Sequence, residues 1–174
     1  EEEGYMGGTE DPRIVYGFGG VIAYKNIDFN FFFQGTADAH RVIGNSTIFL
    51  PGSGTTVQGN AYSENLDDRW TDDNQDPYAF WPRLTYGPNK NNYRASTWWK
   101  KDMSFLRLKT VEIGYTFPKK WMEKIYSKGA RVFVSGNNLL CFSPFKLWDP
   151  ELGTNNGLKY PMNRSILFGI DINF

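Results

Sequence analysis

Residues 166–174 read I-L-F-G-I-D-I-N-F, and their pattern decides which kind of fold the rest of the chain can have. Five apolar residues occupy every second position of this stretch: Ile166, Phe168, Ile170, Ile172 and Phe174. Leu167, Gly169, Asp171 and Asn173 lie between them. Because successive side chains of a β-strand point to opposite faces, the pattern predicts a strand with one apolar wall and one wall of mostly small or polar side chains.

Two further properties of this stretch favour a strand that crosses a membrane. Its length matches the ~9–11 residues that a tilted strand needs to span a bilayer, and its last residue, Phe174, is an aromatic member of the apolar set. Such an ending is similar to the C-terminal signal by which outer-membrane barrel proteins are recognised for assembly. We therefore predict that the five alternating apolar residues form an assembly signal. The alternative is an edge strand of a soluble sandwich.

Composition excludes several classes of site. The 174 residues include 19 basic and 19 acidic side chains, so no electrostatic footprint for nucleic acid is visible. One cysteine, Cys141, and one histidine, His40, exclude an internal disulfide, a cysteine-based metal site and a two-histidine metal site. No run approaches the ~18 apolar residues of a transmembrane helix. The G-x-S-x-G motif and a complete phosphate-binding loop are missing, so we predict no catalytic site, no cofactor and no enzyme activity.

An acidic run raises the question of a metal site. Its aspartates lack the D-x-[DN]-x-[DN]-G spacing of a calcium loop, which favours a solvated acidic loop and predicts no metal site. The run consists of Asp67, Asp68, Asp72, Asp73 and Asp76.

Alternation elsewhere predicts an all-β, antiparallel chain. The predicted strands are residues 16–24, 27–34, 105–117, 130–140 and 160–174, and the first two form a hairpin across Lys25-Asn26. In 130–140 the pattern leaves open whether the Val132/Val134 side or the Phe133 side is the apolar one. We also expect a short helix within 61–70, a helical linker in 119–128, Trp98-Trp99 in a strand, and a turn at Lys101-Asp102.

The connections alternate in length. Those at 25–26 and 118–129 are short or compact, whereas those at about 35–104 and 141–159 are long. Outer-membrane barrels combine short periplasmic turns with long extracellular loops, and the predicted strand directions place both short links at one end. Five strands cannot close a barrel, since single-chain bacterial barrels have ~8 or more strands and an open edge is not tolerated in lipid. We therefore predict that residues 1–174 are the C-terminal segment of a larger barrel.

Several phrases in a fixed order carry a family resemblance: Y-K-N-I-D at 24–28, R-W-T at 69–71, W-P-R-L at 81–84, F-L-R-L-K at 105–109, G-Y-T-F-P at 114–118, R-V-F-V-S-G-N-N-L at 131–139 and W-D-P-E at 148–151. With these spacings, residues 11–174 closely resemble the C-terminal end of SusC/RagA-type TonB-linked (TonB-dependent) outer-membrane transporters. Each phrase alone is weak, but the ordered set is specific. Within the 35–94 loop only the Trp-Thr and Pro-Arg-Leu motifs match the family, so substrate-contacting residues of the family cannot be assigned to positions in this chain.

The resemblance implies both a fold and a function. It implies a 22-stranded transmembrane β-barrel in the outer membrane of a Gram-negative cell, with its plug and N-terminal strands absent from this chain. It also implies import of glycans, oligosaccharides or peptides with energy from TonB, a SusD-like surface lipoprotein as partner, and assembly by the barrel assembly machinery. The TonB-contacting part would lie upstream, so this chain alone should not transport.

Two groups of residues are candidates for sites. Trp70, Trp81 and Trp148 lie in long loops, where an aromatic ring can contact a ligand; packing at the membrane interface or within the loops is the alternative. Asp28, Glu112 and Asp171 fall on the polar side of their strands and would face the lumen, where they could contact the plug or simply line the pore.

Two other classes of protein fit parts of the pattern. One is a soluble, aromatic-rich β-sandwich that binds carbohydrate; it should need no detergent and should not depend on Phe174. The other is a small, self-contained outer-membrane barrel that acts as an adhesin or structural protein.

Overall fold

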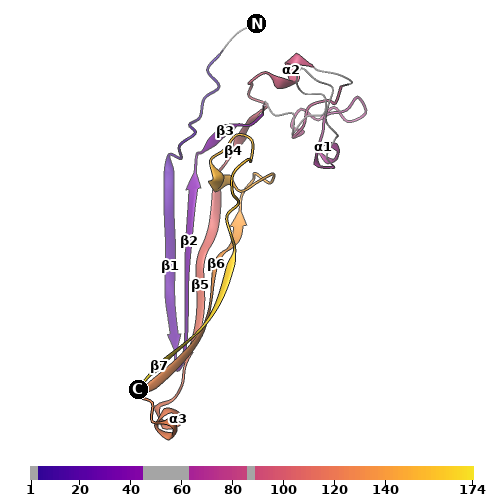
Figure 1. Cartoon of the computed structure of the whole chain (residues 1–174). Helices are drawn as coiled ribbons and strands as arrows, with labels where there is room; N and C mark the ends of the chain where they lie inside the picture. The colour runs from indigo at the N-terminus through magenta and orange to yellow at the C-terminus, as the bar shows by residue number, and fades with distance from the viewer. Residues whose placement is uncertain (1–3, 45–62, 86–88) are drawn as a thin grey trace.

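The computed structural model describes residues 4–44, 63–85 and 89–174. Five strands form one antiparallel sheet with the order β1-β2-β5-β6-β7. Their bounds are β1 (Ile14–Tyr24), β2 (Ile27–Ala37), β5 (Phe105–Thr116), β6 (Gly129–Phe142) and β7 (Ser165–Asn173). The strands run side by side along the length of the molecule, with the long connections at one end and the short turns at the other (Figure 1). We call these the loop end and the turn end.

The register confirms the two-sided pattern, because residues directly opposite each other in an antiparallel pair point to the same face. Phe29 pairs with Ile113, which pairs with Val134, which pairs with Phe168. The apolar face consists of Tyr16, Phe18, Ile22, Tyr24, Ile27, Phe29, Phe31, Phe33, Val111, Ile113, Tyr115, Val132, Val134, Ile166, Phe168, Ile170 and Ile172. The ambiguity in 130–140 is thereby resolved, since Val132 and Val134 belong to this face and Phe133 to the other.

The opposite face carries mostly small and polar side chains, and we call it the polar face. It consists of Gly17, Gly19, Val21, Ala23, Asp28, Asn30, Phe32, Gln34, Thr110, Glu112, Gly114, Arg131, Phe133, Ser135, Leu167, Gly169 and Asp171.

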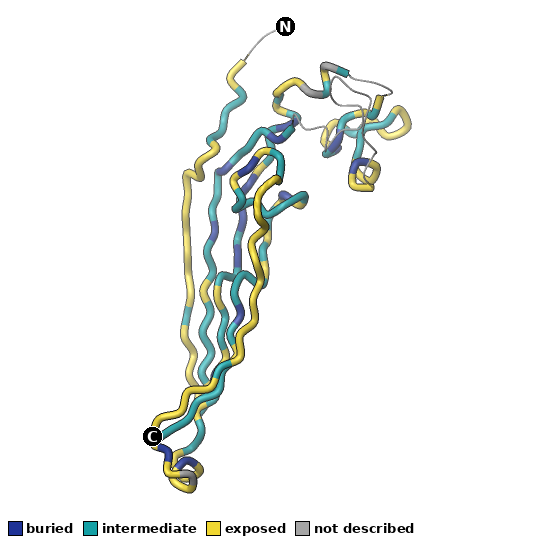
Figure 2. Tube along the Cα trace, viewed as in Figure 1, coloured by how far each residue is buried: buried dark blue, intermediate teal, exposed yellow. Residues whose placement is uncertain are grey.

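Neither face of the sheet is covered in the part of the chain that the structure describes. On the apolar face Phe18 is 52% exposed, Ile170 is 68% exposed and Phe168 is 76% exposed, and exposed residues follow β1 and β7 along their length (Figure 2). Among the described residues, Phe105 at the loop end is the only buried hydrophobic residue that belongs to the sheet. A soluble sandwich would bury one face of each sheet, and this sheet does not.

The hydrophobic core lies instead among the long connections. We call it the loop core; it contains Ala39, Ile43, Trp81, Trp99, Met103 and Phe145, with Val42, Phe80, Trp98, Leu147 and Trp148 packed against it. Two short strands, β3 (His40–Val42) and β4 (Lys100–Asp102), pair beside it and join the connection to the sheet. The predicted turn at Lys101-Asp102 is therefore wrong. Trp98-Trp99 lies in a turn rather than in a strand.

Every helix among the described residues spans at most four residues, and none is both long and apolar enough to cross a membrane. They are α1 (Glu64–Asp67), α2 (Lys90–Tyr93), α3 (Lys119–Met122), and the 3-10 turns η1 (Glu123–Ile125) and η2 (Pro150–Leu152). The helix predicted within 61–70 is reduced to α1, and its first two predicted residues lie outside the described part. The linker after Pro118 is helical as predicted.

Candidate functional site

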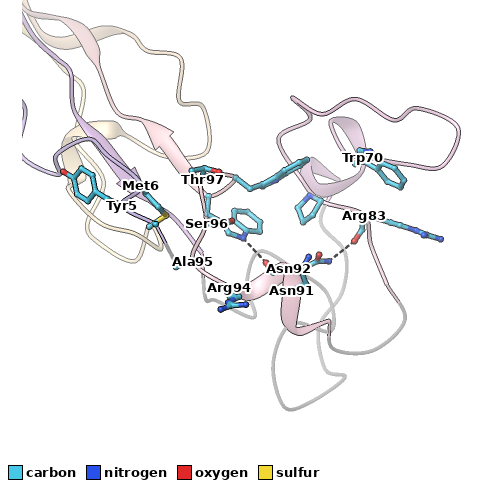
Figure 3. A pocket seen from close by; sticks show the side chains of 14 residues that line it. Tyr5, Met6, Trp70, Arg83, Asn91, Asn92, Arg94, Ala95, Ser96 and Thr97 are labelled. Carbon is cyan, nitrogen blue, oxygen red and sulfur yellow. Dashed lines mark hydrogen bonds between the residues drawn. The ribbon is translucent and has the colours of Figure 1, made fainter. Parts of the chain in front are cut away.

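A hollow of about 900 Å³ opens at the loop end (Figure 3). Its walls come from the N-terminal segment 4–6, from Trp70 and Arg83, and from the stretch 91–99. Asn92 fixes one wall, because its Nδ2 donates to the carbonyl of Arg83 (3.0 Å) and its own carbonyl accepts from Trp99 Nε1 (2.9 Å). The hollow offers indole, guanidinium and amide groups, which together suit a polar ligand with a flat or ring-shaped part.

The three tryptophans predicted to contact a ligand do not form one surface. Trp70 lines the hollow. Trp81 is 2% exposed, and its ring packs at 6.0 Å from that of Trp99 inside the loop core. Trp148 is half-buried, with its ring 4.7 Å from Phe145 in an edge-to-face contact. Of the three, Trp70 is therefore the one that a ligand in the hollow would meet.

The loop core also holds a lysine. Lys101 Nζ lies 3.9 Å from the centre of the Phe80 ring and 3.4 Å from the Phe80 carbonyl. Burial lowers the pKa of Lys101, and the carboxylate of Asp68 opposes that shift. The Lys101 ammonium therefore lies over an aromatic ring at the base of the loops. Its burial costs desolvation free energy, and the cation–π contact offsets part of that cost.

Four charged residues fasten the second long connection, residues 143–164, to the sheet. Arg107 on β5 is 97% buried as a side chain; its Nη2 donates to Asp149 Oδ1 (2.5 Å), and its Nε lies 2.8 Å from Glu151 Oε2 without the angle of a hydrogen bond. Lys109 Nζ donates to Glu151 Oε1 (2.7 Å). A bulge leaves Lys109 out of both strand pairings. We call these four residues the Arg107 cluster.

A second charge cluster lies on the polar face. Arg131 on β6 donates to both carboxylate oxygens of Asp28 on β2 (3.1 and 2.5 Å) and to Glu112 on β5 (2.7 Å). One guanidinium thus joins three neighbouring strands. Asp171 is paired with Arg131 in the β6–β7 register. Asp28, Glu112 and Asp171 therefore share the polar face as predicted, and the first two bind an arginine that the sequence pattern does not predict.

Sequence reasoning missed the basic partners of both clusters. Arg131 and Arg107 each occupy a polar-side position of a strand that was correctly located, and an arginine at such a position is a signal for a carboxylate nearby. No sequence pattern reveals which carboxylate is the partner, because Arg131 and Asp28 are 103 residues apart and Arg107 and Asp149 are 42 residues apart.

No grouping of histidine, cysteine, aspartate and glutamate side chains suited to a metal ion is found among residues 4–44, 63–85 and 89–174. Within the acidic run, Asp72 forms an ion pair with Arg83 (2.9 Å) and Asp76 accepts a hydrogen bond from the backbone of Tyr78 (2.8 Å). These carboxylates are engaged with the protein itself.

Curated proteins similar to this chain are TonB-dependent receptors. TonB-dependent receptor P26 of Formosa agariphila is 33% identical over 182 residues, which cover 96% of this chain and 17% of the receptor. TonB-dependent receptor SusC of Bacteroides thetaiotaomicron is 23% identical over 163 residues, covering 92% of this chain and 15% of SusC. This chain therefore spans about one sixth of the length of these relatives. No family model matches the sequence.

Solved structures of the RagAB peptide importer share the fold. The "open-open" state matches with a TM-score of 0.70 at 28% identity, and the "closed-closed" state with a TM-score of 0.72 at 26% identity. Each match covers 94% of this chain and 17% of the importer chain. The matched proteins are named as receptors and importers, and the shared fold includes nearly all of the sheet and loops described above. Sequence and fold together identify this chain as a segment of a SusC/RagA-type TonB-dependent receptor.

Proposed function

We propose that residues 1–174 form the C-terminal strands and two extracellular loops of a 22-stranded outer-membrane barrel that imports nutrients with energy from TonB. The observation that carries the proposal is the uncovered apolar face. Lipid would cover this face in a barrel wall, whereas a soluble protein would leave several hundred Å² of apolar surface exposed to water. The polar face, with Asp28, Glu112 and Asp171, would then line the lumen and meet the plug.

The residues at the loop end limit the proposed substrate to two broad chemical classes. A hollow lined by Trp70, two arginines and two asparagines is suited to a glycan or a peptide, both of which combine hydrogen-bonding groups with flat or ring-shaped parts. The RagAB neighbours are described as peptide importers, which supports a peptide for this chain. We propose that a SusD-like lipoprotein covers the loop end, and that this arrangement belongs to the outer membrane of a Gram-negative cell.

Two neighbouring residues of β7 provide a matched test in the intact receptor. Phe168 and Leu167 are both exposed, at 76% and 57%, but they lie on opposite faces of the same strand. Lysine on the lipid face near the bilayer midplane costs about 2–4 kcal/mol, whereas lumen-side lysine is tolerated. We expect Phe168→Lys to reduce the folded, heat-modifiable receptor in the outer-membrane fraction and Leu167→Lys to leave it near the wild-type level.

The competing classes give different results in the same experiment. A soluble sandwich would be recovered in the soluble fraction without detergent, because its apolar face would be buried against a second sheet rather than in lipid. That result would overturn the proposal, and so would equal tolerance of both lysines by the receptor in the outer membrane. A self-contained small barrel would show a native polypeptide of only 20.0 kDa. The importer requires a polypeptide several times larger, and its mass is read from the same outer-membrane fraction with an antibody to this segment.

A further inference from the structure

The turn between β5 and β6 combines positive charge with exposed aromatic rings. We call residues 117–128 the basic turn. It carries four lysines against the single acidic residue Glu123, and Lys25 in the neighbouring hairpin turn adds another cation at the same end of the sheet. Because the formal net charge of the whole chain is zero, the remaining residues carry a matching negative excess. The lysines of the basic turn are Lys119, Lys120, Lys124 and Lys128.

The aromatic rings of the basic turn continue the apolar face beyond the end of the sheet. The Tyr115 and Phe117 rings lie 5.3 Å apart edge to face, and the Phe117 and Trp121 rings lie 6.4 Å apart. Trp121 is 56% exposed and Tyr126 is 94% exposed. An unbroken row of rings therefore leads from the proposed lipid-covered wall onto α3, which lies below the strands (Figure 1).

Hydrogen bonds to β7 hold the basic turn in place. The Ser127 hydroxyl and the Lys128 amide both donate to the carbonyl of Asn173, at 2.7 and 2.8 Å. Lys128 Nζ donates to the carbonyl of Phe174 (2.7 Å), and Met122 is buried beneath the turn. The position of Trp121 relative to the apolar face is therefore fixed by the fold.

Three lysines of the basic turn are available to an external partner. Lys119, Lys120 and Lys124 are exposed, and none forms an ion pair with another residue of the described chain. Glu123 offers one negative charge among them. A partner with negative charge at a membrane surface fits both features, because indole rings prefer the boundary between lipid and water while lysines reach into the headgroup layer.

We propose that the basic turn binds anionic phospholipid headgroups in the leaflet at the turn end, with Trp121 anchored at the boundary and Lys119, Lys120 and Lys124 on the phosphates. The proposal rests on the proposed function, since it needs the apolar face to be in lipid. The occupant is a bilayer rather than a protein because the row of rings is continuous with the lipid-covered wall and gives way to lysines where that wall ends.

The test uses the intact receptor in nanodiscs of phosphatidylcholine alone or of an equimolar mixture of phosphatidylcholine and phosphatidylglycerol. Native mass spectrometry counts the phospholipids that remain bound after release from the nanodisc. We expect the wild-type receptor to retain phosphatidylglycerol in preference to phosphatidylcholine. The variant Lys119→Gln/Lys120→Gln/Lys124→Gln should lose that preference.

Two controls separate charge at this place from charge in general. The Lys119→Arg/Lys120→Arg/Lys124→Arg variant keeps the charge and should keep the preference, and Lys146→Gln removes an exposed lysine from the loop end and should change nothing. Equal retention by the glutamine variant and the wild type would overturn the proposal. So would absence of a phosphatidylglycerol preference in a receptor that is correctly inserted and heat-modifiable, and this result would leave the proposed function standing. If the glutamine variant does not fold, the single variants Lys119→Gln, Lys120→Gln and Lys124→Gln replace it, and each should lose part of the preference.

Discussion

At the scale of single residues, Arg107 shows how a long connection is fixed to the sheet. Its side chain is 3% exposed, and its charge is balanced by Asp149 and Glu151, which both belong to the connection 143–164. A buried ion pair adds little net stability when it is intact, but loss of one partner leaves an uncompensated charge in a low dielectric. The Arg107 cluster therefore determines where this loop lies.

Replacing Arg107 tests that role. Arg107→Ala leaves the largely buried Asp149 carboxylate without its cation and Glu151 with Lys109 alone, and we expect the docked loop to lose about 3–5 kcal/mol of local stability. Hydrogen exchange measures this directly, because the Leu152 amide donates to the Asp149 carbonyl (3.1 Å) and should lose protection. Lys109→Ala is the matched control: it removes a more exposed cation with one partner and should have a smaller effect. Unchanged exchange in Arg107→Ala would contradict this role of the Arg107 cluster.

The sequence predicts the face on which a strand residue lies wherever the alternation of apolar and polar residues is clear. Asp28 and Glu112 could be placed on one face because the period of a strand is two and each lies in a clearly alternating stretch. Arg131 could not be matched to them, since the alternation of its own strand left two registers open. The Arg107 cluster could not be predicted for a different reason, because its acidic residues lie in a loop without periodicity.

At the scale of elements, the pairing of β6 with β7 depends on a glycine beneath an aromatic ring. Phe133 on the polar face lies over Gly169, and a Cβ at that position would overlap the ring. The ring shields the bare backbone of the neighbouring strand, which compensates for the missing side chain. Phe133 is for this reason accommodated on a face that is otherwise mostly small and polar.

Substitution of the glycine should therefore weaken this strand pair. We expect Gly169→Ala to cost about 1–3 kcal/mol by overpacking, seen as a lower temperature at which the intact receptor loses heat-modifiability. Gly129→Ala in β6 is the control, because a Cβ there meets nothing within 4 Å. Adding Phe133→Leu to Gly169→Ala should restore part of the loss. A loss of equal size in both glycine variants would argue against ring overlap as the cause.

Prediction of secondary-structure elements was accurate for the five-stranded sheet and poor for the loops. All five sheet strands could be located because each alternates over many residues, although the last begins at Ser165 rather than at 160. Lys101-Asp102 forms β4 because β3 pairs with it from sixty residues away, and no local pattern reveals such a pairing. Trp98 and Trp99 lie in a turn that is closed by hydrogen bonds from the Trp99 amide to the Ser96 carbonyl (3.1 Å) and from the Lys100 amide to the Thr97 carbonyl (3.3 Å).

At the scale of the whole molecule, the apolar residues have two separate destinations. Those of the strands form the exposed apolar face, and those of the connections form the loop core. High aromatic content at 17% is consistent with either use, which is why composition alone could not separate a barrel wall from a carbohydrate-binding sandwich. The distribution of burial separates them, and it follows from three-dimensional packing rather than from sequence.

The predicted assembly signal belongs to this scale, because it concerns how the intact receptor reaches its membrane. Phe174 is 78% exposed, so its loss removes little packing from the folded sheet. We expect Phe174→Ala to lower the amount of receptor in the outer membrane several-fold during early synthesis while leaving the thermal stability of the inserted protein unchanged. Pulse-chase labelling followed by fractionation measures the first quantity. Tyr160→Ala, at an 80% exposed residue outside the strands, serves as control; equal assembly of all three proteins would remove the assignment.

The separation of wall and loop core has a consequence for how such receptors diversify. The sequence of the sheet is constrained by strand register and by whatever covers its apolar face, whereas that of the loops is constrained by whatever they bind. Because the loop core is filled mainly by residues of 38–104 and 143–164, its residues can change together without altering the register of the five-stranded sheet. The sheet and the loop core can then vary independently, and exchange of loops onto an unchanged sheet is a route to a new specificity.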